Sequence, residues 1–249
     1  MHYINLASGS GGNCTVICGK HCKILVDFGI SLKEFKDRIK PYNIKLSDID
    51  ALFYTHSHCD HYRPMKSFSN HKIFTTTSVI NVDTVNNIEL DTSFSFKGLT
   101  ITPISLSHDS PNTFGLIFEE DDEKLVYITD TGYISNTNIE KCKNASIYII
   151  EANHDPIMLL NTERPYSLIV RILGDTGHLS NEDSANYLAE MIGPKTREVA
   201  LAHISREANT PELALQTFKD VLNRRNIDFS QIEFKTLDQF EPTSGGNIN

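Results

Sequence analysis

The sequence lacks any apolar run long enough to cross a membrane. Its most concentrated apolar stretches, residues 147–150 and 168–173, are far shorter than the roughly 20 residues that a spanning helix needs. The opening segment MHYINLA also lacks the basic region ahead of an apolar one that a secretion signal requires. We therefore expect a cytoplasmic protein with no membrane partner.

Cysteine is scarce and is not spaced for disulfides or structural zinc. The chain has five cysteines, and an odd number does not favour a disulfide framework. Cys14, Cys18 and Cys22 follow one another at four-residue intervals, whereas structural zinc sites use closer C-x-x-C pairs. A metal cluster with His21 is the alternative. Free cysteine readily acts as a small buried hydrophobe, so packing within strands is the preferred interpretation.

Positive charge is in deficit. The 23 Lys and Arg residues stand against 32 Asp and Glu residues, which makes the formal net charge −9. Non-specific nucleic-acid binding depends on neutralising phosphates, so a surface that binds nucleic acid everywhere is not expected. A local groove stays open, and bound divalent cations would add attraction for a phosphate. The candidates for a basic track, which could equally be scattered solvated charges, are Lys66, Lys72, Arg164, Arg171 and Arg197.

The chain is long enough for one sizeable core. It has 249 residues, of which 39% are apolar. Strand patterns dominate its first part, and capped helices mixed with strands follow, which predicts an α/β fold: a four-layer αββα sandwich in one compact domain over residues 1–240. Residues 241–249 are rich in Gly, Ser and Asn and are expected to form a frayed tail. The expected strands cover residues 3–6, 14–18, 23–28, 51–54, 72–75, 99–106, 113–119, 124–129, 146–150 and 198–202, and the expected helices cover residues 32–39, 165–173, 181–192 and 211–223.

The segment His56-Ser57-His58-Cys59-Asp60-His61 carries the strongest chemical signal. It follows a strand that is predicted to be buried. In an extended or turning loop His56, His58 and Asp60 can share one side while His61 points elsewhere, an arrangement that suits two neighbouring metals. The alternative is a polar loop of hydrogen-bonded histidines. Imidazoles packed together repel one another when they charge, and a metal removes that cost, so metal binding is the preferred interpretation.

An H-x-H-x-D-H segment after an apolar strand resembles the signature of the metallo-β-lactamase superfamily. The resemblance implies two divalent metals, with zinc preferred and manganese second, and a hydroxide held between them. It assigns His56, His58 and His108 to one metal, and Asp60, His61 and His203 to the other. It makes Asp130 the bridge and Asp27 a support that does not touch the metals. Taken alone, His108, Asp130 and His203 would be ordinary loop or turn residues.

A narrower resemblance covers most of the chain. Residues 7–13, 127–133, 151–155, 177–183 and 202–205 look like the WalJ/YycJ branch, whose members resemble the phosphodiesterase arm of the superfamily and include metal-dependent 5′-to-3′ DNA exonucleases. Ala152 departs from the serine usual there. By similarity to transfer-RNA 3′-processing enzymes, Glu151 and His178 would together pass a proton to the leaving oxygen. The alternative is a loop-capping glutamate and a helix-entry histidine. His154 is a further candidate support for the site.

The glycine-rich bend after the first strand is a candidate phosphate cradle. Ser8, Gly11, Gly12 and Asn13 could offer backbone N–H groups to a phosphate, although a plain hairpin turn explains the glycines equally well.

The leading hypothesis is a two-metal phosphodiesterase, a nuclease acting on DNA. RNA or a small cyclic phosphodiester are alternative substrates. A thioester or lactone hydrolase on the same scaffold is the second enzyme class, and a metal-stabilised binding domain is the non-enzyme alternative.

Overall fold

The computed structural model describes residues 1–64, 72–76, 79 and 85–247. Lys66, one of the candidates for the basic track, lies outside the described residues. Within these ranges the strands form two sheets of seven. The first sheet has the order β14-β1-β2-β3-β4-β5-β6, formed by Thr243–Gly246, His2–Ala7, Cys14–Cys18, Lys23–Val26, Ala51–Phe53, Ile73–Thr75 and Asn86–Asn87. The second has the order β13-β12-β11-β10-β9-β8-β7, formed by Glu233–Thr236, Glu198–Ala202, Ile147–Glu151, Glu123–Ile128, Phe114–Glu120, Leu99–Ser105 and Phe94–Phe96.

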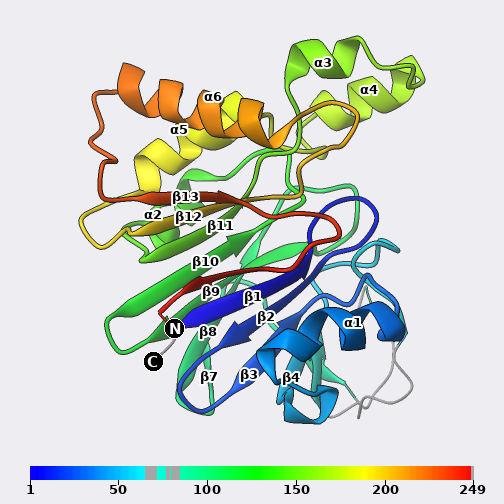
Figure 1. Ribbon diagram of the computed structural model, residues 1–249, viewed down its shortest axis with the longest axis vertical. Helices are drawn as coiled ribbons and strands as arrows, with labels where there is room; N and C mark the ends of the chain where they lie inside the picture. Colours follow the sequence, from blue (N-terminus) through cyan, green and yellow to red (C-terminus); the bar gives the residue numbers. More distant parts are fainter. Residues whose placement is uncertain (65–71, 77–78, 80–84, 248–249) are drawn as a thin grey trace.

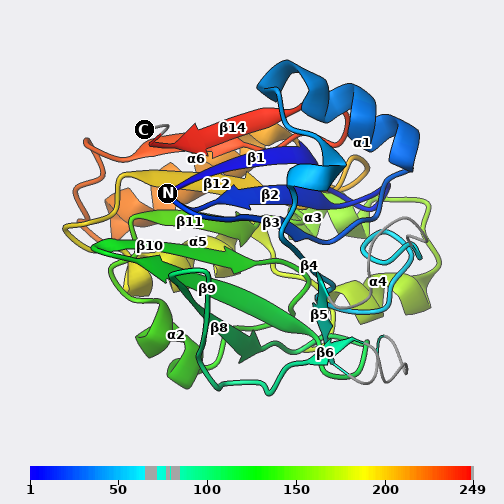
Figure 2. The same ribbon diagram turned by 90° about the horizontal axis from the view of Figure 1, so that it is seen from below.

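The two sheets pack face to face and helices cover their outer sides. The described helices are α1 (Leu32–Ile39), α2 (Asn136–Cys142), α3 (Pro156–Leu160), α4 (Tyr166–Leu173), α5 (Asn181–Met191) and α6 (Pro211–Arg224), with short 3-10 turns η1 (Lys40–Tyr42) and η2 (Leu46–Asp48). Figure 1 shows α5 and α6 on one outer side and α1 on the opposite one, and Figure 2 shows the same layers from below. The predicted αββα sandwich is confirmed.

Side-chain alternation explains why the strands are buried on both faces. All five residues of β11 are buried. Ile147 and Ile149 enter the core between the sheets, whereas Tyr148 and Ile150 face the outer core under α5 and α6. A strand covered on both sides needs apolar residues at every position, and the sequence IYIIE meets that need until its final glutamate.

Most predicted elements are present, and the missed ones are short. The four expected helices correspond to α1, α4, α5 and α6. The five-residue α3 is capped by Asp155, whose side chain accepts from Met158 N, and the seven-residue α2 is capped by Ser135. Neither is long enough to show a clear apolar periodicity. Among the cysteines, Cys14 and Cys18 are buried at the two ends of β2, as strand packing predicted.

The expectation of a frayed tail is wrong for Thr243–Gly246. These residues form β14, which pairs antiparallel with β1 and places Gly246 opposite His2. Gly246 N donates to Glu198 Oε2 (2.8 Å), and Tyr3 Oη donates to Glu198 Oε1 (2.6 Å). A Cβ on Gly245 would lie 1.8 Å from that carboxylate, so the small residues that suggested a loose tail are what let the backbone approach. The two ends of the chain therefore lie side by side (Figures 1 and 2).

No helix within the described ranges is both long enough and apolar enough to cross a membrane.

Candidate metal centre

The site lies where neighbouring parallel strands end. β3 runs parallel to β4, and β10, β11 and β12 are parallel to one another. The carboxyl ends of parallel strands meet at one edge of a sheet, so residues that directly follow them converge. The converging residues are Asp27 after β3, His56 after β4, Asp130 after β10, Glu151 at the end of β11 and His203 after β12.

Three of these residues have left-handed backbone conformations. The φ angles are 59° for Asp27, 60° for Asp130 and 53° for His203. A residue with a Cβ is uncommon in this region, and aspartate is among the few that tolerate it. The sharp turn at each position sends the chain away from the sheet and leaves the side chain at the strand end. Three strand ends at the site therefore carry a backbone conformation that is uncommon for residues with a Cβ.

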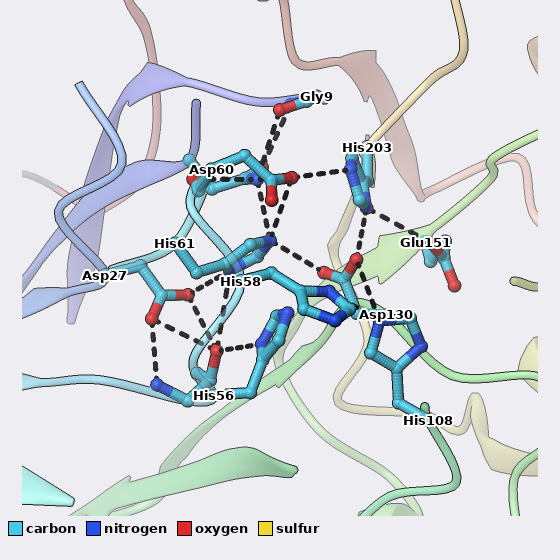
Figure 3. A network of polar contacts seen from close by, with 12 residues as sticks. Gly9, Asp27, His56, His58, Asp60, His61, His108, Asp130, Glu151 and His203 are labelled. Carbon is cyan, nitrogen blue, oxygen red and sulfur yellow. Dashed lines mark hydrogen bonds and ion pairs between the residues drawn. The ribbon is translucent and has the colours of Figure 1, made fainter. Parts of the chain in front are cut away.

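The predicted ligands gather into overlapping groups that could each hold a metal ion. In each group the potential ligand atoms lie within 4.8 Å of one another. His56, His58 and His108 form one group and Asp60, His61 and His203 form another, so the structure brings together the two sets that the resemblance assigned to two metals. Figure 3 shows Asp130 between the two sets, with its carboxylate close to His61 and His203. Among the described residues there are four such potential metal-binding groups: His56/His58/His108, Asp60/His61/His203, His56/His61/Asp130 and Asp130/Glu151/His178/His203.

Hydrogen bonds orient two imidazoles so that one nitrogen of each stays available. Thr55 Oγ1 donates to Asp27 and accepts from His56 Nδ1 at 3.0 Å, which leaves His56 Nε2 with a lone pair. His108 Nδ1 donates to the carbonyl oxygen of Gly177 at 3.0 Å, which leaves its Nε2 with a lone pair. A hydrogen bond on one ring nitrogen sets the tautomer and directs the other nitrogen towards a metal.

Asp27 holds His61 in the same way. Its Oδ2 lies 2.7 Å from His61 Nδ1, and its Oδ1 accepts from Thr55 N at 2.8 Å. Burial raises the pKa of Asp27, although His61 opposes that shift. Burial also acts to lower the pKa of His61, but the carboxylates of Asp130 and Asp27 raise it well above its ordinary value. His61 Nε2 then faces Asn13, Asp60 and Asp130.

Asp130 is the central carboxylate. Its Oδ2 lies 3.0 Å from His61 Nε2, and its Oδ1 lies 3.0 Å from His203 Nδ1. Burial acts to raise the pKa of Asp130, but the neighbouring His203 and His61 hold it well below its ordinary value. The carboxylates of Asp130 and Glu151 in turn raise the pKa of His203 to about 10, against the effect of burial.

The donor set fits divalent metal ions. His56 Nε2, Asp130 Oδ2 and His203 Nδ1 are buried and have no hydrogen-bond partner of good geometry. Buried polar atoms without partners are costly, and cations at this position would satisfy them. The buried carboxylates of Asp27, Asp130 and Glu151 also need compensating positive charge, which protons on histidines supply in the metal-free chain. Metal binding would displace such protons.

Glu151 and His178 form a pair beside this cluster. Glu151 Oε1 lies 2.8 Å from His178 Nδ1, and Glu151 Oε2 accepts from Thr131 N and Leu179 N. Glu151 is fully buried, whereas the side chain of His178 is 18% exposed. Burial acts to raise the pKa of Glu151, but His178 and His203 lower it to about 2. The structure thus presents an imidazole held by a carboxylate, and this imidazole lines a cavity that opens onto the predicted metal ligands.

The residues of the glycine-rich bend that were predicted to bind phosphate, Ser8, Gly11, Gly12 and Asn13, use their backbone N–H groups within the protein. The N–H groups of Ser8, Gly9 and Gly11 donate to Asp238 O, Asn13 Oδ1 and Gln239 Oε1, and those of Gly12 and Asn13 donate to Gly9 O and Asp60 O. Because each of these donors is already used, the bend positions the metal loop instead. Asn13 Nδ2 lies 2.7 Å from His61 Nε2, and Ser8 Oγ accepts from His203 N.

His154 is buried, and among the described residues neither of its ring nitrogens has a hydrogen-bond partner. Burial lowers its pKa to about 4. Its backbone carbonyl accepts from Asn181 N, which ties the turn after β11 to the start of α5.

A cavity of about 180 Å³ opens onto the cluster and contains basic side chains. Arg164 and Arg171 line it together with Asp130, His178 and Ser10. Among the residues that the structure describes, Arg164 and Arg171 are therefore the members of the predicted basic track that reach the site. Lys72 instead donates to Ile49 O, and Arg197 pairs with Glu123 at the opposite end of β12.

Sequence reasoning missed several residues that act on the site. Thr55 precedes the histidine segment directly, and Asp109 follows His108 directly, so adjacency was the available signal. Asp109 pairs with Arg171, and its Oδ1 lies 3.3 Å from His108 Nε2. Asn153 donates to His203 O at 2.9 Å, a contact that no local pattern indicates.

The chain matches a family model and curated relatives over most of its length. Residues 23–204 match the family model described as "Beta-lactamase superfamily domain". The chain is 30% identical to exodeoxyribonuclease YycJ of Bacillus anthracis over 261 residues, covering 98% of this chain and 97% of the relative. It is 33% identical to exodeoxyribonuclease WalJ of Streptococcus pneumoniae over 257 residues, covering 97% and 95%.

Solved structures share the fold at low identity. The metallo-beta-lactamase fold protein YhfI of Bacillus subtilis matches with a TM-score of 0.71 at 15% identity, covering 98% of this chain and 99% of that one. The short form of human tRNase Z matches with a TM-score of 0.65 at 15% identity and covers 98% of each chain. A diphosphatase of the PhnP family matches with a TM-score of 0.64 at 16% identity, covering 98% of each chain.

Proposed function

Because this chain belongs to the metallo-β-lactamase superfamily and is a metal-dependent hydrolase, we propose that it cleaves the phosphodiester bonds of DNA. His56, His58 and His108 would hold one divalent ion, Asp60, His61 and His203 the other, and Asp130 would contact both. Zinc is the proposed metal, with manganese second, because imidazole-rich sites suit zinc. Two such ions lower the pKa of water to make a nucleophile and neutralise charge on phosphoryl oxygens.

The pair of Glu151 and His178 carries the proposal. An alkoxide leaving group from a phosphodiester needs a proton, and an imidazole at the cavity wall is the side chain best suited to donate it near neutral pH. Glu151 Oε1 lies 2.8 Å from His178 Nδ1, so the buried carboxylate orients the ring. A thiolate leaving group needs no such proton, which makes a thioesterase the weaker candidate.

Charge in the cavity supports an anionic substrate. Arg164 and Arg171 line the same cavity as Asp130 and His178. Arg164 pairs with Glu207 and Arg171 with Asp109, and each guanidinium group has further N–H donors for phosphate oxygens. DNA is favoured over RNA because relatives named as exodeoxyribonucleases match nearly the whole chain. Cleavage from the 5′ end is also part of the proposal, and it rests on the resemblance of the sequence motifs to the WalJ/YycJ branch.

A set of parallel assays tests the proposal. The zinc-loaded and manganese-loaded protein is incubated with 5′-labelled single-stranded and duplex DNA, RNA of the same sequence, bis-p-nitrophenyl phosphate and a thioester. We expect release of labelled mononucleotide from DNA. Hydrolysis of the thioester with DNA left intact would overturn the proposal, and faster cleavage of RNA would change the substrate.

The variant Asp130→Asn tests whether hydrolysis depends on the bound metal. Asparagine tolerates the left-handed backbone at this position, so the fold is expected to survive. The variant should lose metal, measured by elemental mass spectrometry, and should lose phosphodiester hydrolysis with it. Full activity at reduced metal content would contradict the two-metal mechanism.

A further inference from the structure

A second pocket adjoins the metal centre and is larger than the cavity over the metal ligands. Its volume is about 490 Å³, against about 180 Å³ for the cavity. Ser205 lines both, so the two spaces share part of a wall. Ligand pockets for drug-sized molecules measure about 300 to 1,000 Å³. The smaller space therefore suits the phosphodiester group, and the rest of the substrate must occupy neighbouring space.

An exposed aromatic ring lines this larger pocket. Phe240 is 51% exposed, although a ring of this size is ordinarily buried. The guanidinium carbon of Arg206 lies 5.1 Å from the centroid of the ring. Aromatic rings and arginine planes are the surfaces on which bases of single-stranded nucleic acids stack, and such stacking tolerates any sequence.

The turn that carries Phe240 is anchored to the bend beside the metal loop. Asp238 Oδ1 accepts from Phe240 N (2.7 Å) and from Glu241 N (2.9 Å). Ser8 N donates to Asp238 O, and the side chain of Gln239 bonds Gly11 N and Gly12 O. Figure 1 shows this turn, between β13 and β14, beside the bend that follows β1. Hydrogen bonds thus hold the backbone segment that carries the exposed ring, which lowers the entropy lost on binding.

The charges of the residues that line the pocket indicate which part of the substrate it can bind. Glu212 and Asp238 line it, and both carry negative charge, whereas Arg206 is its basic residue. Two carboxylates disfavour a phosphate in this space, and a neutral ring avoids that repulsion. The arginines that suit phosphate lie in the metal cavity instead.

We propose that this pocket binds a nucleobase of the substrate strand, stacked on Phe240 beside Arg206, while the adjoining phosphate lies at the metal centre. The inference rests on the proposed function, since it requires a nucleic-acid substrate. The pocket then contributes affinity for any base and makes a nucleic-acid strand a better substrate than a phosphodiester without bases.

Fluorescence tests the contact before turnover. The chain contains no tryptophan, so Phe240→Trp introduces a single reporter at the pocket. The probes, mixed with the metal-loaded chain and read before appreciable hydrolysis, are an oligodeoxynucleotide and an abasic deoxyribose phosphate strand of the same length. We expect the oligodeoxynucleotide to quench the tryptophan and the abasic strand to leave it unchanged. Equal quenching by the two strands, or none by either, would overturn the proposal.

Phe229→Trp is the matched control. Phe229 is partly buried against Phe234 just before β13, at the opposite end of the sheet from the site. Its reporter should respond to neither strand, and a response equal to that of Phe240→Trp would overturn the proposal. Quenching at Phe240→Trp without any hydrolysis of DNA by the metal-loaded native chain would support the pocket while refuting the proposed function.

Steady-state kinetics give a second readout. Phe240→Leu keeps an apolar side chain but removes the aromatic face, and it should raise KM for the oligonucleotide about 5-fold to 100-fold with kcat little changed. Phe240→Tyr should restore a KM near that of the native chain. A KM unchanged in Phe240→Leu would contradict the stacking role.

Discussion

Gly29 lies directly against the carbonyl oxygen of Asp60. A Cβ on Gly29 would be 1.6 Å from that oxygen and 2.8 Å from Asn13 N. The turn after β3, the glycine-rich bend and the metal loop are therefore packed backbone to backbone, and Asn13 N donates to Asp60 O at 2.7 Å. Placement of the metal loop depends on the absence of a side chain at a position that lies outside the metal-binding segment.

Gly29→Ala should therefore displace the metal loop. Backbone atoms cannot yield as a flexible side chain can, so we expect loss of metal and destabilisation of about 1 to 3 kcal/mol. Metal content and urea unfolding in EDTA measure the two effects. Gly19→Ala is the control, because its nearest contact is the Glu120 carboxylate at 3.3 Å. A Gly29→Ala protein with full metal content and native stability would show that the contact is not required.

Asp27→Asn should weaken metal binding without removing a ligand. The variant loses the charge that holds His61 Nδ1 at 2.7 Å, and such supporting carboxylates are worth about 10-fold to 100-fold in metal affinity. Competition with a zinc chelator measures the change. Asp50→Asn, just before β4 at the far end of that strand, should bind zinc as the native chain does. Equal zinc affinity in Asp27→Asn and Asp50→Asn would show that Asp27 does not support the metal site.

His178→Ala should separate proton donation from metal binding. Loss of a general acid lowers the rate on DNA by about 100-fold to 10,000-fold. The effect on bis-p-nitrophenyl phosphate should be much smaller, because nitrophenolate leaves without a proton. Metal content should stay unchanged. His178 also belongs to a potential metal-binding group with Asp130. Loss of metal in this variant would therefore show that His178 is a metal ligand and not the proton donor.

Stability should depend on pH through His154. Burial lowers its pKa to about 4 in the folded chain, against about 6.5 when unfolded. The unfolded chain then binds more protons between these values, so the stabilisation by neutral His154 is present above pH 6.5 and is lost as the pH falls towards 4. The contribution is about 3 kcal/mol. The free energy of unfolding of His154→Phe, measured in EDTA, should fall less with acid than that of the native chain. Parallel curves would contradict this assignment.

Truncation before Thr243 should destabilise the first sheet. It removes β14 and leaves β1 as an exposed edge, and it deprives buried Glu198 of its bond from Gly246 N. A buried acceptor that loses its partner costs about 1 to 3 kcal/mol. Exposed edges also pair with other chains, so light scattering should rise together with the loss in urea stability. An unaltered urea midpoint would show that β14 contributes little.

The sequence by itself determined the local features of this protein. Alternating apolar residues indicated the strands, and Ser31, Ser180 and Thr210 marked the starts of helices where the structure has them. The segment from His56 to His61 indicated metal chemistry, because four potential ligands so close together can be recognised without knowledge of the fold. These features depend on neighbours along the chain, and their physical causes act within a few residues.

Only the tertiary structure decided the contacts between distant segments. The partner of β14 is a strand at the other end of the chain, so its composition alone predicted a loose tail. The donors of the glycine-rich bend are used by Asp60 O, Asp238 O and Gln239, which local pattern cannot indicate. The same holds for the arginines of the cavity and for Phe240, because burial and charge at a site are set by which strand ends the two sheets bring together.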